Sequence, residues 1–203
     1  MTTKTKVLVS GFEPFGGAKL NPSELLVHEL NKIEFNEIEL STVILPVEFD
    51  RAVDVLLRKV KELKPEIVIA FGQAEGRTAI TPEKIAINLD DARIPDNSGD
   101  QRKNQVIDEG GSDGYFSTLP IEAMVDAMKA VGYPAEISLS AGAFVCNHVF
   151  YSLQRALIGT SIRSGFVHLP LVNEQVAEFP GKFTMELSEM VNAVKAALDA
   201  AAN

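Results

Sequence analysis

The sequence has a single cysteine, Cys146, among its 203 residues. One thiol cannot form an intrachain disulfide, and it rules out a zinc or iron–sulfur site built on several cysteines. The sequence also lacks a long hydrophobic run: the apolar stretch at the N-terminus (MTTKTKVLVSGF) is too short for a signal-peptide core, and no other stretch approaches the length of a membrane span. These absences predict a protein of the reducing cytoplasm without a membrane partner.

Positive charge is scarce as well. Lys and Arg number 19 against 28 Asp and Glu, which gives a formal net charge of −9. An acidic surface repels phosphate, and this argues against nucleic acid as a partner. The apolar fraction of 46% and charged fraction of 23% are typical of a globular protein. The length suits one domain over residues 1–203.

Hydrophobic periodicity predicts strands that alternate with helices along the chain. We expect strands at 7–10, 39–45, 66–71, 79–88, 135–140 and 165–169, and helices at 21–32, 49–63, 121–131, 146–157 and 185–201. Such alternation is typical of an α/β fold with a mostly parallel sheet covered by helices on both faces. Ligands of these folds bind at the carboxyl ends of the strands.

Residues 90–114 show neither the helical nor the strand periodicity of apolar residues. The segment is charged and rich in glycine, so it is predicted to be a long loop. Long loops inside a compact domain are usually functional or mobile.

Cys146 lies in SLSAGAFVCNHVFYSL, which predicts a strand, a turn and then a helix with the thiol in its first turn. The positive end of the helix dipole would favour a thiolate there, and free backbone N–H groups could stabilise an oxyanion. The alternative is a buried, inert cysteine, which is a common role for a free thiol.

A cysteine nucleophile requires a base, and the chain has three histidines. His28 lies in the middle of a predicted helix. His148 is two residues after Cys146, and positions i and i+2 of a helix do not face each other. His168 lies near the end of a predicted strand in FVHLP, where a parallel sheet presents catalytic side chains, so it is the favoured candidate.

An acidic group usually orients such an imidazole. Glu83 stands in an apolar pattern, AITPEKIAIN, where a carboxylate needs a partner. The other candidates are Asp90, Asp91, Asp96 and Glu174, and the pattern alone does not choose among the five.

The loop GFEPFGG at residues 11–17 follows the first predicted strand and precedes a helix. Its spacing differs from the G-x-G-x-x-G of a dinucleotide loop. Phe12 and Phe15 suit a flat, neutral, apolar ligand, or they cover the core beneath the loop.

Several blocks of the sequence then converge on one resemblance: GFEPFGG with NPSE, TPEKIAINLDDARIPDN, YFSTLP, SAGAFVCNHVFY and SGFVHLP. In this order, over nearly the whole chain, they resemble the pyroglutamyl peptidase I (pyrrolidone carboxyl peptidase) family of cysteine peptidases. The resemblance implies a three-layer α/β/α sandwich with a mostly parallel, mixed sheet. It also implies a homotetramer.

The same resemblance implies residue roles. The catalytic residues would be Cys146, His168 and Glu83, with no metal and no cofactor. Arg93 would lie near the oxyanion region, and the substrate pocket would include Phe12, Phe15, Gln73, Ile94, Phe144 and Val145. Two departures from the family pattern are the segment 99–114, which does not align firmly, and Asn173, which replaces an expected proline.

The implied activity is removal of an N-terminal pyroglutamyl residue from peptides and proteins. Two alternatives remain open: a cysteine amidase acting on another cyclic or acylated amide, and a small-molecule binding protein with an unreactive Cys146. Nucleotide binding by the 11–17 loop is disfavoured by its glycine spacing and by the acidic charge balance.

Overall fold

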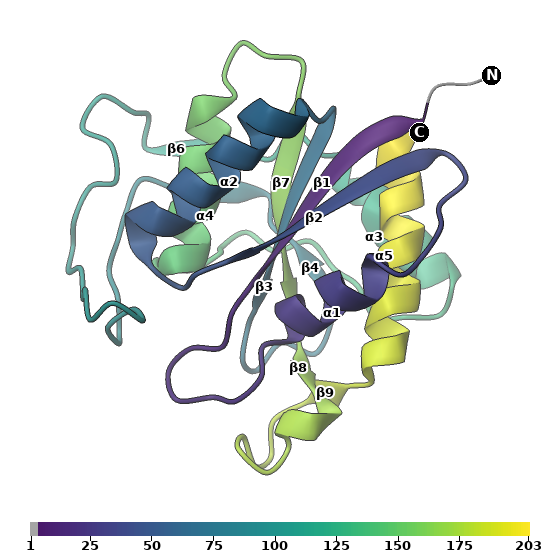
Figure 1. Cartoon of the computed structure of the whole chain (residues 1–203). Helices are drawn as coiled ribbons and strands as arrows, with labels where there is room; N and C mark the ends of the chain where they lie inside the picture. The colour runs from purple at the N-terminus through teal and green to yellow at the C-terminus, as the bar shows by residue number, and fades with distance from the viewer. Residues whose placement is uncertain (1–3) are drawn as a thin grey trace.

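The computed structural model of the protein describes residues 4–203 (Figure 1). Its centre is a five-stranded sheet in the order β2 (Ile38–Leu45), β1 (Thr5–Phe12), β3 (Ile67–Gln73), β7 (Arg163–Leu169) and β4 (Thr81–Pro82). The first four strands are parallel, and β4 runs antiparallel to β7 at the edge. The prediction of a mostly parallel, mixed sheet is confirmed.

Helices cover both faces of the sheet, as Figure 1 shows. One face carries α1 (Pro22–Leu30), α3 (Ile121–Ala130) and α5 (Leu187–Ala202), and the other carries α2 (Phe49–Leu63) and α4 (Val145–Ala156). The predicted three-layer α/β/α sandwich is therefore confirmed.

The alternation of β1 explains why two separate cores form. Val7 and Val9 point into the core under α1, α3 and α5, whereas Leu8 and Phe12 point into the core under α2 and α4. Successive side chains of a strand point to opposite faces of the sheet. A strand that is apolar at both its odd and its even positions can therefore be buried on both faces.

Shorter strands form two separate two-stranded sheets. Strands β5 (Ile85–Ile87) and β6 (Gly114–Phe116) form an antiparallel pair, and β8 (Leu171–Val172) and β9 (Thr184–Met185) form a parallel one. A short 3₁₀ helix, η1 (Asn173–Gln175), follows β8. The single strand predicted at 79–88 is wrong, because this stretch changes partner from β7 to β6 and divides into β4 and β5.

The strand predicted at 135–140 is also wrong. That segment makes two isolated bridges, Ile80 with Ala135 and Glu83 with Ser138. Backbone bonds run from Glu136 to Ile80 and from Ser138 to Pro82, but a continuous parallel ladder would also need an N–H at Pro82. Proline has no N–H, so the ladder is interrupted between the two bridges.

The predicted helices agree closely with the observed ones. Asn21 caps α1 by accepting the N–H of Ser23 at 3.0 Å, although the helix ends at Leu30 rather than near residue 32. Helix α2 has the predicted bounds. Of the helices within residues 4–203, none is long and apolar enough to cross a membrane.

The long loop at 90–114 is held by ion pairs together with one isolated antiparallel bridge, Asp90 with Gln105. Arg102 bonds to Asp90 at 3.1 Å and to Asp100 at 2.9 Å, and it also pairs with Asp50 on α2. Its guanidinium lies 4.5 Å from the ring centre of Phe49. These contacts fasten the loop to the helical layer that carries Cys146.

Candidate active site

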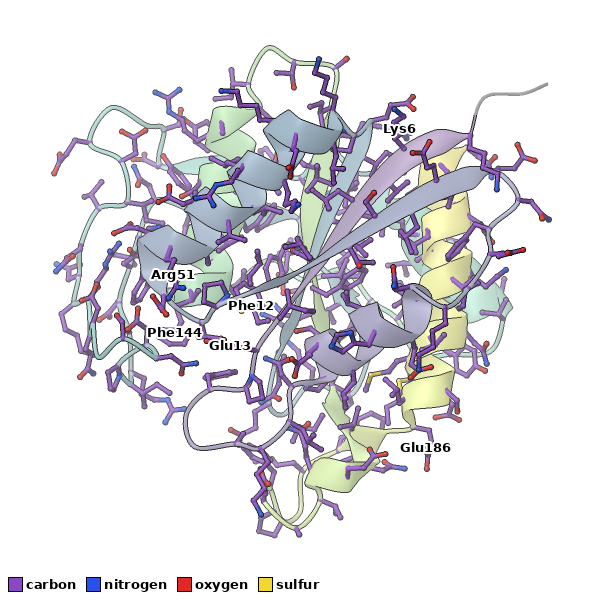
Figure 2. The ribbon with its side chains drawn as sticks, in the orientation of Figure 1. Lys6, Phe12, Glu13, Arg51, Phe144 and Glu186 are labelled. Carbon is purple, nitrogen blue, oxygen red and sulfur yellow. The ribbon has the colours of Figure 1, made fainter. Side chains whose placement is uncertain are left out.

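The carboxyl ends of β1, β3 and β7 meet the N-terminus of α4, and most of the predicted site residues gather there. Strand β1 ends at Phe12, and Phe144 is the N-cap of α4. Figure 2 shows these two residues close together, and both line one small cavity. The expectation that ligand-binding residues lie at the strand ends agrees with this geometry.

His168 and Glu83 form a buried pair. The Nδ1 of His168 lies 2.7 Å from Oε1 of Glu83, whose side chain is fully buried. The antiparallel pairing of β4 with β7 sets this geometry: Thr81 lies opposite His168, and the N–H of Glu83 donates to the carbonyl of Phe166 at 2.8 Å. The histidine and the acid favoured from the sequence are thus in direct contact.

The competing histidines are engaged elsewhere or exposed. His148 bonds through Nδ1 to Asp90 at 2.8 Å, on the side of α4 that faces the 90–114 loop. His28 is exposed on α1. Among the competing acids, Asp96 accepts the N–H of Phe49.

Cys146 is the second residue of α4. Its Sγ lies over Gly72 of β3: a Cβ added at Gly72 would be 2.9 Å from the sulfur and 2.8 Å from the ring of Phe166. Gly72 is the register partner of His168 in the neighbouring parallel strand, so the thiol and the imidazole occupy the same face of the sheet. Within residues 4–203 no hydrogen bond joins the Sγ to another residue, and such contacts commonly tighten when substrate binds.

The surroundings of Cys146 favour the protonated thiol. Burial raises the pKa of Cys146 to about 12, and the negative charge of Glu83 adds to the increase. The sequence suggested instead that the helix N-terminus would favour a thiolate. Burial opposes that effect, so a thiolate at this position would require proton transfer to a base.

The first turn of α4 supplies backbone donors beside the sulfur. Helical bonding begins with the N–H of His148, which donates to the carbonyl of Phe144 at 3.0 Å. The N–H groups of Val145, Cys146 and Asn147 precede that bond and have no acceptor within the helix. They lie where an oxyanion formed next to the Sγ could be stabilised.

Eight residues line the small cavity that opens next to the thiol: Phe12, Phe15, Asn21, Val47, Gln73, Phe144, Val145 and Cys146. The rings of Phe15 and Phe144 are 6.0 Å apart, and Phe49 packs edge-on against Phe144 at 5.5 Å. None of the eight carries a formal charge when the thiol is protonated. The cavity therefore suits a flat, neutral group with few polar atoms.

The structure does not bring all predicted pocket residues to this cavity. The side chain of Ile94 lies near Gly16, and Arg93 is exposed. Asn21 and Val47 line the cavity but were not identified from the sequence, in which Asn21 was recognised only as a helix cap. Val47 follows β2, and an aliphatic side chain in that position does not by itself indicate a binding site.

A chain of hydrogen bonds fixes the amide of Gln73. The backbone N–H of Val172 donates to Oε1 of Gln175 at 3.1 Å, so the Nε2 of Gln175 is its donor. This Nε2 donates to the carbonyl of Leu20 at 3.2 Å and to Oε1 of Gln73 at 2.9 Å. The remaining amide atom of Gln73 is its Nε2, a hydrogen-bond donor available to a ligand in the cavity.

Replacing Gly72 with alanine is expected to displace the sulfur. The backbone of Gly72 is not in the left-handed region, so alanine fits the main chain, but its Cβ would lie 2.9 Å from Sγ. A misplacement of about 1 Å can cost about 100-fold in rate, so kcat should fall by that order while the protein remains folded. The measurement is the steady-state rate of hydrolysis of a pyroglutamyl amide, the substrate class that the resemblance implies. Circular dichroism of the same variant checks that it is folded.

Gly76→Ala is the matched control, because nothing lies within 4 Å of a Cβ there and the residue is exposed. Its positive φ of 87° will cost some stability. Wild-type kcat in Gly72→Ala would contradict the close approach of the thiol to β3.

The sequence of the chain is similar to those of known peptidases. A sequence profile described as pyroglutamyl peptidase matches residues 5–203. The chain is 46% identical over 195 residues to a pyrrolidone-carboxylate peptidase from Cupriavidus pinatubonensis, covering 95% of this chain and 90% of that protein. It is 45% identical over 199 residues to one from Streptococcus suis, covering 96% and 91%.

Solved structures are similar over almost the whole chain. Pyroglutamyl peptidase I from Bacillus amyloliquefaciens superposes with a TM-score of 0.95 at 40% identity, covering 98% of this chain and 96% of that one. A mutant pyrrolidone carboxyl peptidase from Pyrococcus furiosus superposes with a TM-score of 0.91 at 41% identity, covering 97% and 98%.

Proposed function

The chain belongs to the pyroglutamyl peptidase family, and from this premise we propose that it is a pyroglutamyl peptidase I, a cysteine peptidase that removes pyroglutamate from the N-termini of peptides and proteins. One observation carries the proposal for the site. The only thiol of the chain opens into an uncharged aromatic cavity, on the sheet face that also holds the His168–Glu83 pair.

Catalysis begins with the transfer of the Cys146 proton to the Nε2 of His168. The sulfur attacks the carbonyl carbon that joins pyroglutamate to the next residue, and the C–S bond forms as negative charge develops on the oxygen. Backbone N–H groups of the first turn of α4 stabilise this oxyanion. Glu83 accepts a hydrogen bond from Nδ1 of His168 at 2.7 Å, which fixes the tautomer and stabilises the imidazolium.

The intermediate then collapses. The C–N bond breaks, and His168 returns its proton to the leaving amine. Water, deprotonated by His168, attacks the thioester; the C–S bond breaks, His168 returns the proton to the sulfur, and the thiol of Cys146 is restored as pyroglutamate leaves. No metal or organic cofactor enters these steps.

Recognition follows from the chemistry of the cavity. Pyroglutamate is a cyclic lactam without a charged amine, and the lining contains no carboxylate that would require one. Phe12, Phe15 and Phe144 contact the faces and edge of the ring. The Nε2 of Gln73, held by Gln175, donates to the lactam carbonyl, which is the atom that distinguishes pyroglutamate from proline.

The proposal is tested with coumarin amides of pyroglutamate, proline and glutamine. A site built to donate to the lactam carbonyl rejects the analogue that lacks it, so kcat/KM for the pyroglutamyl amide should exceed that for the prolyl amide by about 10⁴-fold. Comparable rates, or faster cleavage of the glutaminyl amide, would support a cysteine amidase instead. Cleavage of none of the three, with a Cys146 that iodoacetamide does not label, would support a binding protein.

The resemblance to this family also supports proposals about its setting. We propose that residues 1–203 form one catalytic domain that assembles as a homotetramer in the cytoplasm. Pyroglutamyl peptides are the substrates, and neither nucleic acid nor a membrane is a partner. In the same resemblance, Arg93 and Ile94 belong to the site; binding of substrate would have to bring them to the cavity.

A further inference from the structure

We propose that Arg77 is a positioning residue for catalysis: its guanidinium holds Glu83 as an oriented carboxylate and balances the charge of that carboxylate beside the reacting Cys146–His168 pair. The inference rests on the proposed function of the site, and it adds a residue from the loop between β3 and β4. Nothing in the sequence marked this arginine as part of the site.

The geometry of Arg77 is specific. The two N–H groups of its Nη2 are shared among three acceptors: Oε1 of Glu83 at 3.2 Å, the hydroxyl of Ser138 at 2.9 Å and the carbonyl of Ser140 at 3.0 Å. The backbone N–H of Arg77 donates to the carbonyl of Ala74, which closes the turn after β3. The acceptors hold the guanidinium and the turn bond holds the main chain, so Arg77 is fixed at both ends of its side chain.

One carboxylate oxygen serves two donors. Oε1 of Glu83 accepts from Arg77 and lies 2.7 Å from Nδ1 of His168, whereas Oε2 is buried without a hydrogen-bond partner in the described part of the chain. A buried carboxylate with one bare oxygen is costly to keep ionised unless a cation contacts it. Arg77, with 29% of its side chain exposed, is that cation.

Charge counting shows why this matters for the reaction. Transfer of the proton from Cys146 to His168 creates a thiolate and an imidazolium beside the Glu83 carboxylate, a set with a net charge of −1. Glu83 by itself opposes the thiolate, since its charge raises the pKa of the thiol. The transfer leaves the net charge of the set unchanged; what Arg77 does is offset the negative charge of Glu83 that opposes the thiolate, which lowers the cost of the reactive form in a buried site.

Loss of the arginine has the same consequence by either of two routes. If Glu83 stays ionised, the thiolate forms next to an unbalanced negative charge. If Glu83 takes up a proton, the imidazolium of His168 loses its counter-charge. The ionisable groups in contact at this point are Glu83 after β4, His168 on β7 and Arg77 in the β3–β4 loop, with Cys146 on α4 above them.

The experiment compares Arg77→Met, Arg77→Gln and Arg77→Lys. Methionine removes charge and donors, glutamine retains a donor for Ser138 without the charge, and lysine retains the charge. We expect kcat on the pyroglutamyl coumarin amide to fall about 10- to 100-fold in both neutral variants, as for the loss of one charge-assisted hydrogen bond. KM should change by less than about threefold, because Arg77 does not line the cavity.

The second readout does not depend on the peptidase activity. The rate of Cys146 alkylation by iodoacetamide is measured against pH, and its profile should move to higher pH by about one unit in Arg77→Met and Arg77→Gln. Arg77→Lys should retain the wild-type profile. A wild-type enzyme that fails to cleave pyroglutamyl amides would refute the proposed function, while the alkylation profiles would still decide the role of Arg77.

Arg155→Met is the matched control, since Arg155 pairs with Asp108 at 2.9 Å on the last turn of α4, outside the site. It should leave both readouts unchanged. A wild-type alkylation profile in the folded Arg77→Gln variant would overturn the proposal, as would equal losses in Arg77→Lys and Arg77→Gln. If Arg77→Met does not fold, the glutamine and lysine variants decide in the same way.

Discussion

Replacing Cys146 with alanine is expected to abolish cleavage of a pyroglutamyl coumarin amide. The substitution removes the atom that forms the covalent bond, and loss of a nucleophile from a catalytic triad lowers kcat by about 10⁶-fold. The side chain is small and lies at the start of α4, between Gly72 and the cavity, so the free energy of unfolding should change by only about 1 kcal/mol. Initial rates and a thermal melt measure the two effects.

Cys146→Ser is the companion variant, because it keeps the shape of the side chain and replaces only the sulfur. A hydroxyl in this half-buried position is a much weaker nucleophile than a thiol, so Cys146→Ser should retain under about 1% of wild-type kcat. Full activity in the folded alanine variant would rule out Cys146 as the nucleophile and leave the chain without a thiol to take its place.

Glu83→Gln should lower kcat by about 10²- to 10⁴-fold, since it removes the charge that stabilises the imidazolium while leaving the nucleophile in place. The carboxylate is fully buried, and its Oε1 accepts hydrogen bonds from both His168 and Arg77. A neutral amide of the same shape can still accept through one oxygen, so some activity remains. KM should be nearly unchanged because Glu83 does not line the cavity.

The matched control is Glu174→Gln. This glutamate was an open candidate for the acid, and in the structure it is exposed on the 3₁₀ helix η1. It should leave kcat and KM at wild-type values. A larger loss in Glu174→Gln than in Glu83→Gln would reassign the acid, and equal wild-type rates in both would show that His168 needs no carboxylate partner.

The sequence predicts the fold well because the layers follow from periodicity. Strand β1 is apolar at both parities, which is the pattern of a strand covered on both faces, and α2 carries its apolar residues at helical spacing up to Pro65. The two strand predictions that are wrong fall where backbone hydrogen bonding differs from what the hydrophobic pattern suggests. The stretch 79–88 alternates like one strand, yet it exchanges partners midway, and Pro82 interrupts the ladder expected at 135–140.

The site was predictable only in part. His168 could be preferred to His148 because helix geometry and strand ends limit what each can reach, and the structure shows His148 bonded to Asp90 instead. The choice of Glu83 came from the family resemblance, since five acids were equivalent by pattern. The roles of Arg77, Asn21 and Gln175 depend on contacts between distant parts of the chain, such as the 102 residues between Gln73 and Gln175, which no local pattern encodes.

The central claim is that Cys146 attacks pyroglutamyl amides to form a thioester. It is tested most directly by acid quenching of the enzyme during turnover, followed by intact-mass and peptide-mapping mass spectrometry. We predict one pyroglutamyl group per chain, attached at Cys146, absent from Cys146→Ala and absent when a prolyl amide replaces the substrate. Two results would contradict the account while the wild type releases pyroglutamate rapidly. One is an acyl group attached to a residue other than Cys146, and the other is equal product formation by Cys146→Ala.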